Sequence, residues 1–110
     1  MATKPLPRRP EYTDPLVERY AGADMVRVFS ADTKFTTWRQ LWIALAECQK
    51  QLGLGVSAEQ IAEMKAHLSP IDYDRVRELE AETRHDVMAH LRAFGEQCPS
   101  AKPIMHLGAT

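Results

Sequence analysis

The sequence of 110 residues has no long apolar run and almost no net charge, and each shortage excludes a class of protein. Its apolar runs, such as residues 41–46, are far shorter than the roughly 20 residues that a membrane-spanning helix requires. Lys and Arg together number 14 against 15 for Asp and Glu, so the broad basic surface that holds nucleic acid or anionic lipid is missing. We therefore expect a protein that binds neither nucleic acid nor membranes.

Cysteine is also scarce. Cys48 lies within a helical pattern and Cys98 precedes a proline, which favours two reduced thiols over a disulfide framework. The N-terminal stretch MATKPLPRRP has basic residues but no apolar stretch behind them, so it does not resemble a secretory signal. Both observations predict a cytoplasmic protein.

Proline is concentrated at the N-terminus, whereas helical periodicity fills the rest of the chain. Residues 1–15 contain four prolines and little apolar content, so we expect an extended arm there. Residues 16–110 show no strand alternation and no repeats. The sequence therefore predicts an all-α fold, a small helical domain of about four helices that follows an extended, Pro-rich N-terminal arm.

The strongest helical pattern covers residues 30–52. Ser30 or Asp32 can cap its start, and Gly53 supplies a stop. Apolar residues recur there at steps of three and four and predict a single buried stripe, made of Phe35, Trp38, Leu41, Trp42, Leu45 and Leu52.

Three further helices are expected. The second begins at Ser57, which can form a capping box with Gln60, and ends before Pro70. The third begins at Asp72 in an acid-rich stretch. The fourth begins in the stretch TRHDVMAH, with Thr83 as its expected cap.

The stretch TRHDVMAH, residues 83–90, is unusually rich in side chains that carry chemistry. Asp86 has a structural explanation, because a carboxylate in the first turn is stabilised by the helix dipole. A charged His85 would oppose that dipole, so we expect a neutral imidazole from which the helix gains nothing. Metal binding by Asp86 and His90 is an alternative, although no second histidine has metal-ligand spacing, and His90 alone is typical of packing.

Three separated stretches are familiar in combination: VFSADTKFTTWRQLWIALAECQKQLGL, RHDVMAH and IMHLGAT, together with ERY at residues 18–20. From about residue 11 to the last residue, the chain resembles the N-terminal domain of the adenylosuccinate lyase family, within the fumarase/aspartase superfamily. The resemblance implies a homotetramer in which each active site is assembled from three subunits. It also implies a reaction, without metal or organic cofactor, that eliminates fumarate from adenylosuccinate, giving AMP, and from succinyl-aminoimidazole-carboxamide ribotide.

The resemblance also implies which residues bind the nucleotide substrate. It places Arg19 and Tyr20 at the substrate phosphate. It places Arg84, His85 and Asp86 in the nucleotide pocket, and Thr110 at the succinyl or fumarate carboxylate. His85 is expected to bind and orient substrate, with acid catalysis as a second role open to it. In the family, the general acid and the serine of the signature loop come after the position of Thr110. We therefore expect residues 16–110 to be a helical lyase domain, truncated at its C-terminal end, and the polypeptide 1–110 to be inactive by itself.

A non-catalytic helical interaction module derived from a lyase is the alternative function. Such a module would bind the full enzyme or another partner through an exposed apolar face. A reading frame that continues after Thr110 into a serine, a helix and the missing histidine favours the enzyme, whereas a natural stop codon there favours the module.

Overall fold

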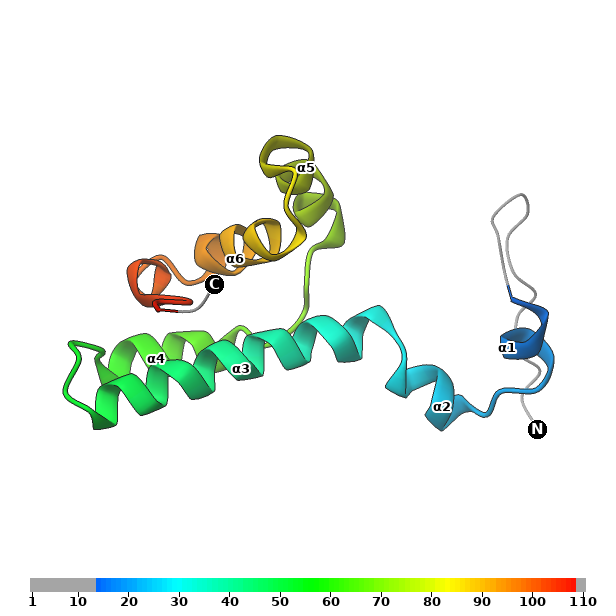
Figure 1. Ribbon diagram of the computed structural model, residues 1–110, viewed down its shortest axis with the longest axis horizontal. Coiled ribbons are helices and arrows are strands. Elements are labelled where there is room, and N and C mark those ends of the chain that lie inside the picture. The colour runs from blue at the N-terminus through cyan, green and yellow to red at the C-terminus, as the bar shows by residue number, and fades with distance from the viewer. Residues whose placement is uncertain (1–13, 109–110) are drawn as a thin grey trace.

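The computed structural model describes residues 14–108, which form helices joined by turns (Figure 1). No strand occurs in this range, so the predicted all-α class is confirmed. The predicted four helices are present, and two short helices precede them. In chain order the elements are α1 (Pro15–Arg19), α2 (Ala23–Val28), α3 (Ala31–Gln51), α4 (Ala58–Ala66), α5 (Tyr73–Thr83), α6 (Asp86–Gln97) and the 3-10 helix η1 (Lys102–Ile104).

Helices α3 and α4 begin where their caps predict. The Ser30 hydroxyl accepts a hydrogen bond from the Thr33 amide at 3.2 Å, and Ser57 forms the expected capping box with Gln60. Gly53 follows the end of α3 with a φ of 74°, in the left-handed region that glycine adopts at low cost.

The predicted apolar stripe of α3 is partly wrong. Leu41 and Leu52 are 62% and 75% exposed, whereas Arg39, Ile43 and Ala46 are buried. Periodicity alone did not identify the buried side because both sides of this helix carry large apolar residues.

Helices α1 and α2 were not predicted. Pro15 starts α1, where its missing N–H has no intrahelical partner to lose, and the Asp14 carboxylate accepts from the Leu16 amide at 2.9 Å. Pro15, the last residue of the predicted arm, is thus the first residue of α1, and residues 1–13 of that arm lie outside the described range. These helices have 5 and 6 residues, too few for the apolar periodicity that reveals a helix in a sequence, and neither contains a buried residue.

The fold is elongated because α1 and α2 project from one end of α3 (Figure 1). The radius of gyration is 17.2 Å, against about 13 Å for a compact domain of this length. Helix α4 packs along the C-terminal half of α3, and α6 lies across this pair with α5 beside it. None of the helices among residues 14–108 is long and apolar enough to cross a membrane.

The core lies where α3, α4 and α6 meet. Phe94, Met64 and Cys98 are fully buried there, and the Trp42 indole packs on the Phe94 ring with a centroid distance of 6.2 Å. A second, smaller cluster joins α5 to α6 and is made of Ile71, Val76, Leu79, Ala89 and Ala93.

The buried side chain of Arg39 forms hydrogen bonds that join α3 to the ends of α4 and α6. Its Nη1 donates to the His67 carbonyl at 2.6 Å, at the C-terminal end of α4, and to the Gln97 side-chain oxygen at 2.7 Å, at the end of α6. The guanidinium carbon lies 4.4 Å from the centroid of the Phe94 ring. Burial lowers the pKa of Arg39 from its usual value.

Candidate functional site

The connection between α5 and α6 carries three of the predicted binding residues next to one another. Arg84 ends α5 with a φ of 52°, and its amide donates to the Glu80 carbonyl at 2.7 Å. This left-handed conformation is uncommon for a residue with a side chain. It turns the chain between the two helices, and the side chains of Arg84, His85 and Asp86 are all exposed.

His85 is the cap of α6, and the prediction that Thr83 has this role is wrong. The His85 Nδ1 accepts a hydrogen bond from the Met88 amide at 3.2 Å. Thr83 is instead the last residue of α5, and its hydroxyl accepts from the His85 amide at 3.3 Å and donates to the His85 carbonyl at 3.0 Å. The expectation that the helix gains nothing from His85 is therefore also wrong, because a neutral imidazole caps its first turn.

This cap determines which ring nitrogen of His85 carries the proton. Because Nδ1 accepts from the Met88 amide, the neutral ring is protonated on Nε2, which is left as a donor. Asp86 Oδ1 lies 3.9 Å from Nδ1, too far for a hydrogen bond, and accepts instead from the Val87 amide at 2.8 Å. The connection thus presents a cation, a neutral N–H donor and a carboxylate on one turn.

The other predicted residues do not join this turn. Arg19 ends α1 and Tyr20 follows it, with 76% of Tyr20 exposed. Helix α1 lies at one end of the molecule, beyond α2 and apart from α5 and α6 (Figure 1). Thr110 lies outside the described residues. Among the predicted site residues that fall within residues 14–108, only Arg84, His85 and Asp86 are brought together.

His90 is a packing residue. It is 4% exposed, and its ring stacks on Phe35 with a centroid distance of 3.9 Å and meets the edge of Trp38 at 5.4 Å. Burial, reinforced by the nearby cation of Arg39, lowers the pKa of His90 to about 4. Residues 14–108 contain no group of three His, Cys, Asp or Glu side chains placed to hold a metal ion, so the structure does not support the metal-site alternative at Asp86 and His90.

The burial of His90 leads to a testable pH dependence. Between pH 6.5 and pH 4 the unfolded chain binds a proton at His90 that the folded chain excludes, so stability falls as the pH falls through this window. We expect His90 to contribute a slope of up to ~1.4 kcal/mol of unfolding free energy per pH unit there. Urea unfolding at several pH values, compared between the wild type and His90→Phe, measures this slope. Carboxylates affect both proteins alike, so equal slopes in the two would contradict the prediction.

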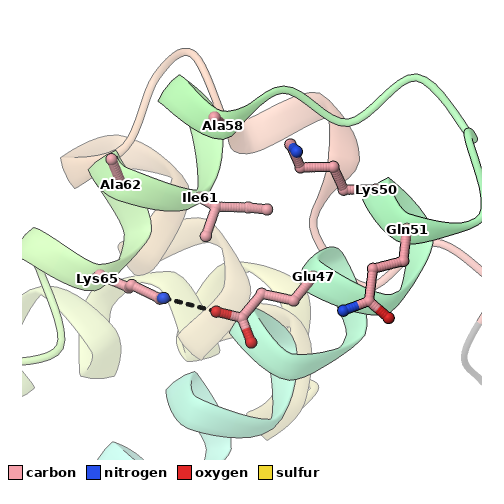
Figure 2. Close-up of a pocket in the computed structure, with 7 residues that line it drawn as sticks. All are labelled: Glu47, Lys50, Gln51, Ala58, Ile61, Ala62 and Lys65. Atoms are coloured by element: carbon pink, nitrogen blue, oxygen red, sulfur yellow. Dashed lines mark ion pairs between the residues drawn. The ribbon is translucent and has the colours of Figure 1, made fainter.

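A groove of about 520 Å³ between α3 and α4 is distinct from the α5–α6 turn. Figure 2 shows Ile61 at its floor, with Lys50 and Gln51 at its edge. Glu47 and Lys65 form an ion pair of 2.6 Å across it. The groove contains none of the predicted binding residues.

Comparison with known proteins finds relatives that share one name. No family model matches the chain. Adenylosuccinate lyase from Schistosoma mansoni is 50% identical over 100 residues, which make up 91% of this chain and 21% of that protein. The Saccharomyces cerevisiae enzyme of the same name is 46% identical over 108 residues, covering 96% of this chain and 22% of that protein. The Schizosaccharomyces pombe enzyme is 44% identical over 102 residues, covering 90% and 21%.

These matches agree with the resemblance drawn from the motifs. The chain spans about a fifth of the length of the curated relatives that it matches. Nearly all of this chain is covered, including the α5–α6 turn and its three exposed polar residues. Over the residues matched, the chain is therefore homologous to adenylosuccinate lyases.

Proposed function

We propose that this chain supplies part of the substrate site of an adenylosuccinate lyase, which eliminates fumarate from adenylosuccinate to give AMP and from succinyl-aminoimidazole-carboxamide ribotide. The observation that carries the proposal is the identity of 44 to 50% to three enzymes of that name. The exposed turn of Arg84, His85 and Asp86 supports it. Its cation, its N–H donor and its carboxylate can bind the anionic groups, the acceptor atoms and the hydroxyl or amino groups of a nucleotide.

In the proposed site each residue binds or orients substrate. The Nε2–H of His85 donates to an acceptor atom of the substrate, and its Nδ1 stays engaged with the Met88 amide. Arg84 offers a planar set of donors to an anionic group, and Asp86 accepts from hydroxyl or amino groups. Arg19 and Tyr20 bind the phosphate, and Thr110 binds the carboxylate of the succinyl group.

The elimination needs two further groups. A base removes a proton from the carbon beside a carboxylate, and an acid protonates the departing amine. We assign neither role to His85, because a proton on Nδ1 would remove the cap of α6. In the proposed enzyme these groups come from other parts of the protein, and no metal or organic cofactor takes part.

The proposed enzyme is a cytoplasmic homotetramer. Helices α1 and α2 support an assembly, because they expose apolar side chains that a larger protein would cover: Leu16 is 67%, Met25 56%, Val28 54% and Phe29 83% exposed. A non-catalytic interaction module would use the same surface, so activity has to distinguish the two functions.

The direct test is release of fumarate from adenylosuccinate. We expect release by the protein expressed at the full length of its relatives, and none by the polypeptide 1–110 alone. A full-length protein that binds partners but releases no fumarate would support the interaction module instead. Turnover by the polypeptide 1–110 would show that the acid and base are already present in it.

Two substitutions of Arg84 separate its proposed role in binding substrate from its role in turning the backbone between α5 and α6. Because its φ of 52° is costly for any residue with a Cβ, Arg84→Gly should be more stable than Arg84→Ala by about 1 kcal/mol. Both variants lose the guanidinium, so both should raise the KM for adenylosuccinate to a similar extent. Thermal unfolding and steady-state kinetics of the pair test this. A wild-type KM in either variant would show that Arg84 only turns the chain.

A further inference from the structure

Helix α3 has a second apolar side, which faces away from the core. The residues that α3 buries are Arg39, Trp42, Ile43 and Ala46. Because an α-helix turns by about 100° per residue, positions 41, 48 and 52 lie on the opposite side, with position 45 next to them. Leu41 is 62% exposed and Leu52, at the C-cap, 75%; Cys48 is exposed and Leu45 is half-buried. We call these four residues the outer seam of α3.

The outer seam has the spacing of a helix-pairing surface. Its residues follow one another at steps of four, three and four, as the apolar positions of a coiled coil do when they insert between residues of a facing helix. None of the four belongs to either buried cluster of residues 14–108 or packs against one. Three turns of α3 therefore present a regular apolar surface that no described part of the chain covers.

The surface around the outer seam carries no charge. Gln40, Ala44 and Gln51 are the exposed residues along one edge. The charged residues between positions 40 and 52 are Glu47 and Lys50, and both line the groove toward α4, where Glu47 forms an ion pair (Figure 2). A partner selected by opposite charge would find no complement on the seam, whereas a second copy of the same surface meets no like charge.

The spacing of the seam is also symmetric about its middle. In an antiparallel pair of α3 helices, Leu41 of one copy meets Leu52 of the other, and Leu45 meets Cys48. Each contact then occurs twice, as a two-fold interface requires. We propose that the outer seam is a dimerisation surface on which two copies of this chain pair antiparallel. This pairing is independent of the proposed function, and its tests measure no activity.

The dimer should be weak and reversible. Three helical turns from each copy bury less than the roughly 1,200 Å² at which stable interfaces begin, so we expect a dissociation constant on the order of 100 µM. Sedimentation equilibrium of the polypeptide 1–110, which contains both buried clusters, measures this constant. Reducing conditions keep disulfides between the thiols of two copies from contributing. A chain that stays monomeric at about 1 mM would overturn the proposal.

Two matched substitutions separate the outer seam from the other exposed apolar surface, on α1 and α2. Leu41 is 62% and Leu16 on α1 67% exposed, so glutamate at either position leaves the core intact. Leu41→Glu enters the two-fold interface twice and should weaken association at least about tenfold, whereas Leu16→Glu should change it less than about twofold. Circular dichroism should show equal helix content in both. Equal weakening by the two substitutions would overturn the proposal.

Mixing two variants tests the direction of the pair. Leu52→Lys should also weaken self-association. An equimolar mixture of Leu41→Glu and Leu52→Lys should dimerise more tightly than either variant alone, because in an antiparallel pair the new carboxylate of one copy meets the new ammonium group of the other. In a parallel pair each new charge would face a leucine instead. Mixing without a gain in association would overturn the antiparallel dimer.

Discussion

Replacing His85 with alanine in the full-length enzyme should lower kcat/KM for adenylosuccinate by at least about 100-fold, the usual cost of losing a preorganised donor. The same change should also lower the unfolding free energy by about 1 kcal/mol, because the first turn of α6 loses its cap. The loss of stability is expected from the hydrogen bond between the Met88 amide and Nδ1. The loss of activity is expected from the exposed Nε2–H.

His85→Asn separates these two effects. The asparagine side chain can accept from the Met88 amide as a cap, so stability should stay within about 0.5 kcal/mol of the wild type. It is shorter than histidine and cannot present a donor where Nε2 lies, so activity should remain as low as in His85→Ala. Urea unfolding and steady-state kinetics on the two variants give the comparison. An Asn variant with wild-type activity would reduce His85 to a helix cap.

Replacing Arg39 with alanine should be among the most destabilising single changes in the described part of the chain, at about 3 kcal/mol or more. Arg39 is 1% exposed, so truncation leaves a cavity between α3 and α6. It also removes the donor that the His67 carbonyl and the Gln97 side chain share. Chemical unfolding at pH 7 measures the loss.

The matched variant Arg39→Met fills most of the same volume without a charge. Two of the Arg39 nitrogens, Nε and Nη2, have no hydrogen-bond partner, and no carboxylate among residues 14–108 forms an ion pair with it, so burying the cation is itself costly. We therefore expect Arg39→Met to cost about 1 kcal/mol, well below alanine. If methionine proved as destabilising as alanine, the two hydrogen bonds rather than the packing would hold these helices together.

The structural features that could be predicted from the sequence are those that depend on residues close together in the chain. The caps at Ser30, Ser57 and Asp72 each join a side chain to an amide three residues away, so the interacting groups lie within one stretch of sequence. The resemblance to adenylosuccinate lyases could also be predicted from the sequence, because it depends on residue types in order. The all-α class followed from helical periodicity without any knowledge of contacts.

The start of α6 shows where local reasoning was insufficient. Thr83 and His85 can each cap a helix, and the choice depends on how far α5 continues. Helix α5 runs through Thr83 and turns at Arg84 in a left-handed conformation, which leaves His85 to cap α6. That outcome depends on how α5 and α6 pack against each other through Val76, Leu79 and Ala89, and not on capping preference.

Tertiary structure alone decided which side of α3 is buried and how residues 98–108 are held. Arg39 meets a carbonyl 28 residues away and an amide side chain 58 residues away, and the bond between Gln49 and Leu107 also spans 58 residues. No periodicity within one helix encodes such partners, because they exist only once α4 and α6 have packed against α3. The sequence by itself determined the four longer helices, the caps at Ser30, Ser57 and Asp72 and the resemblance to adenylosuccinate lyases; packing determined that an arginine is buried, that Leu41 is exposed and that Glu63 on α4 accepts from the amides of Ser100 and Ala101.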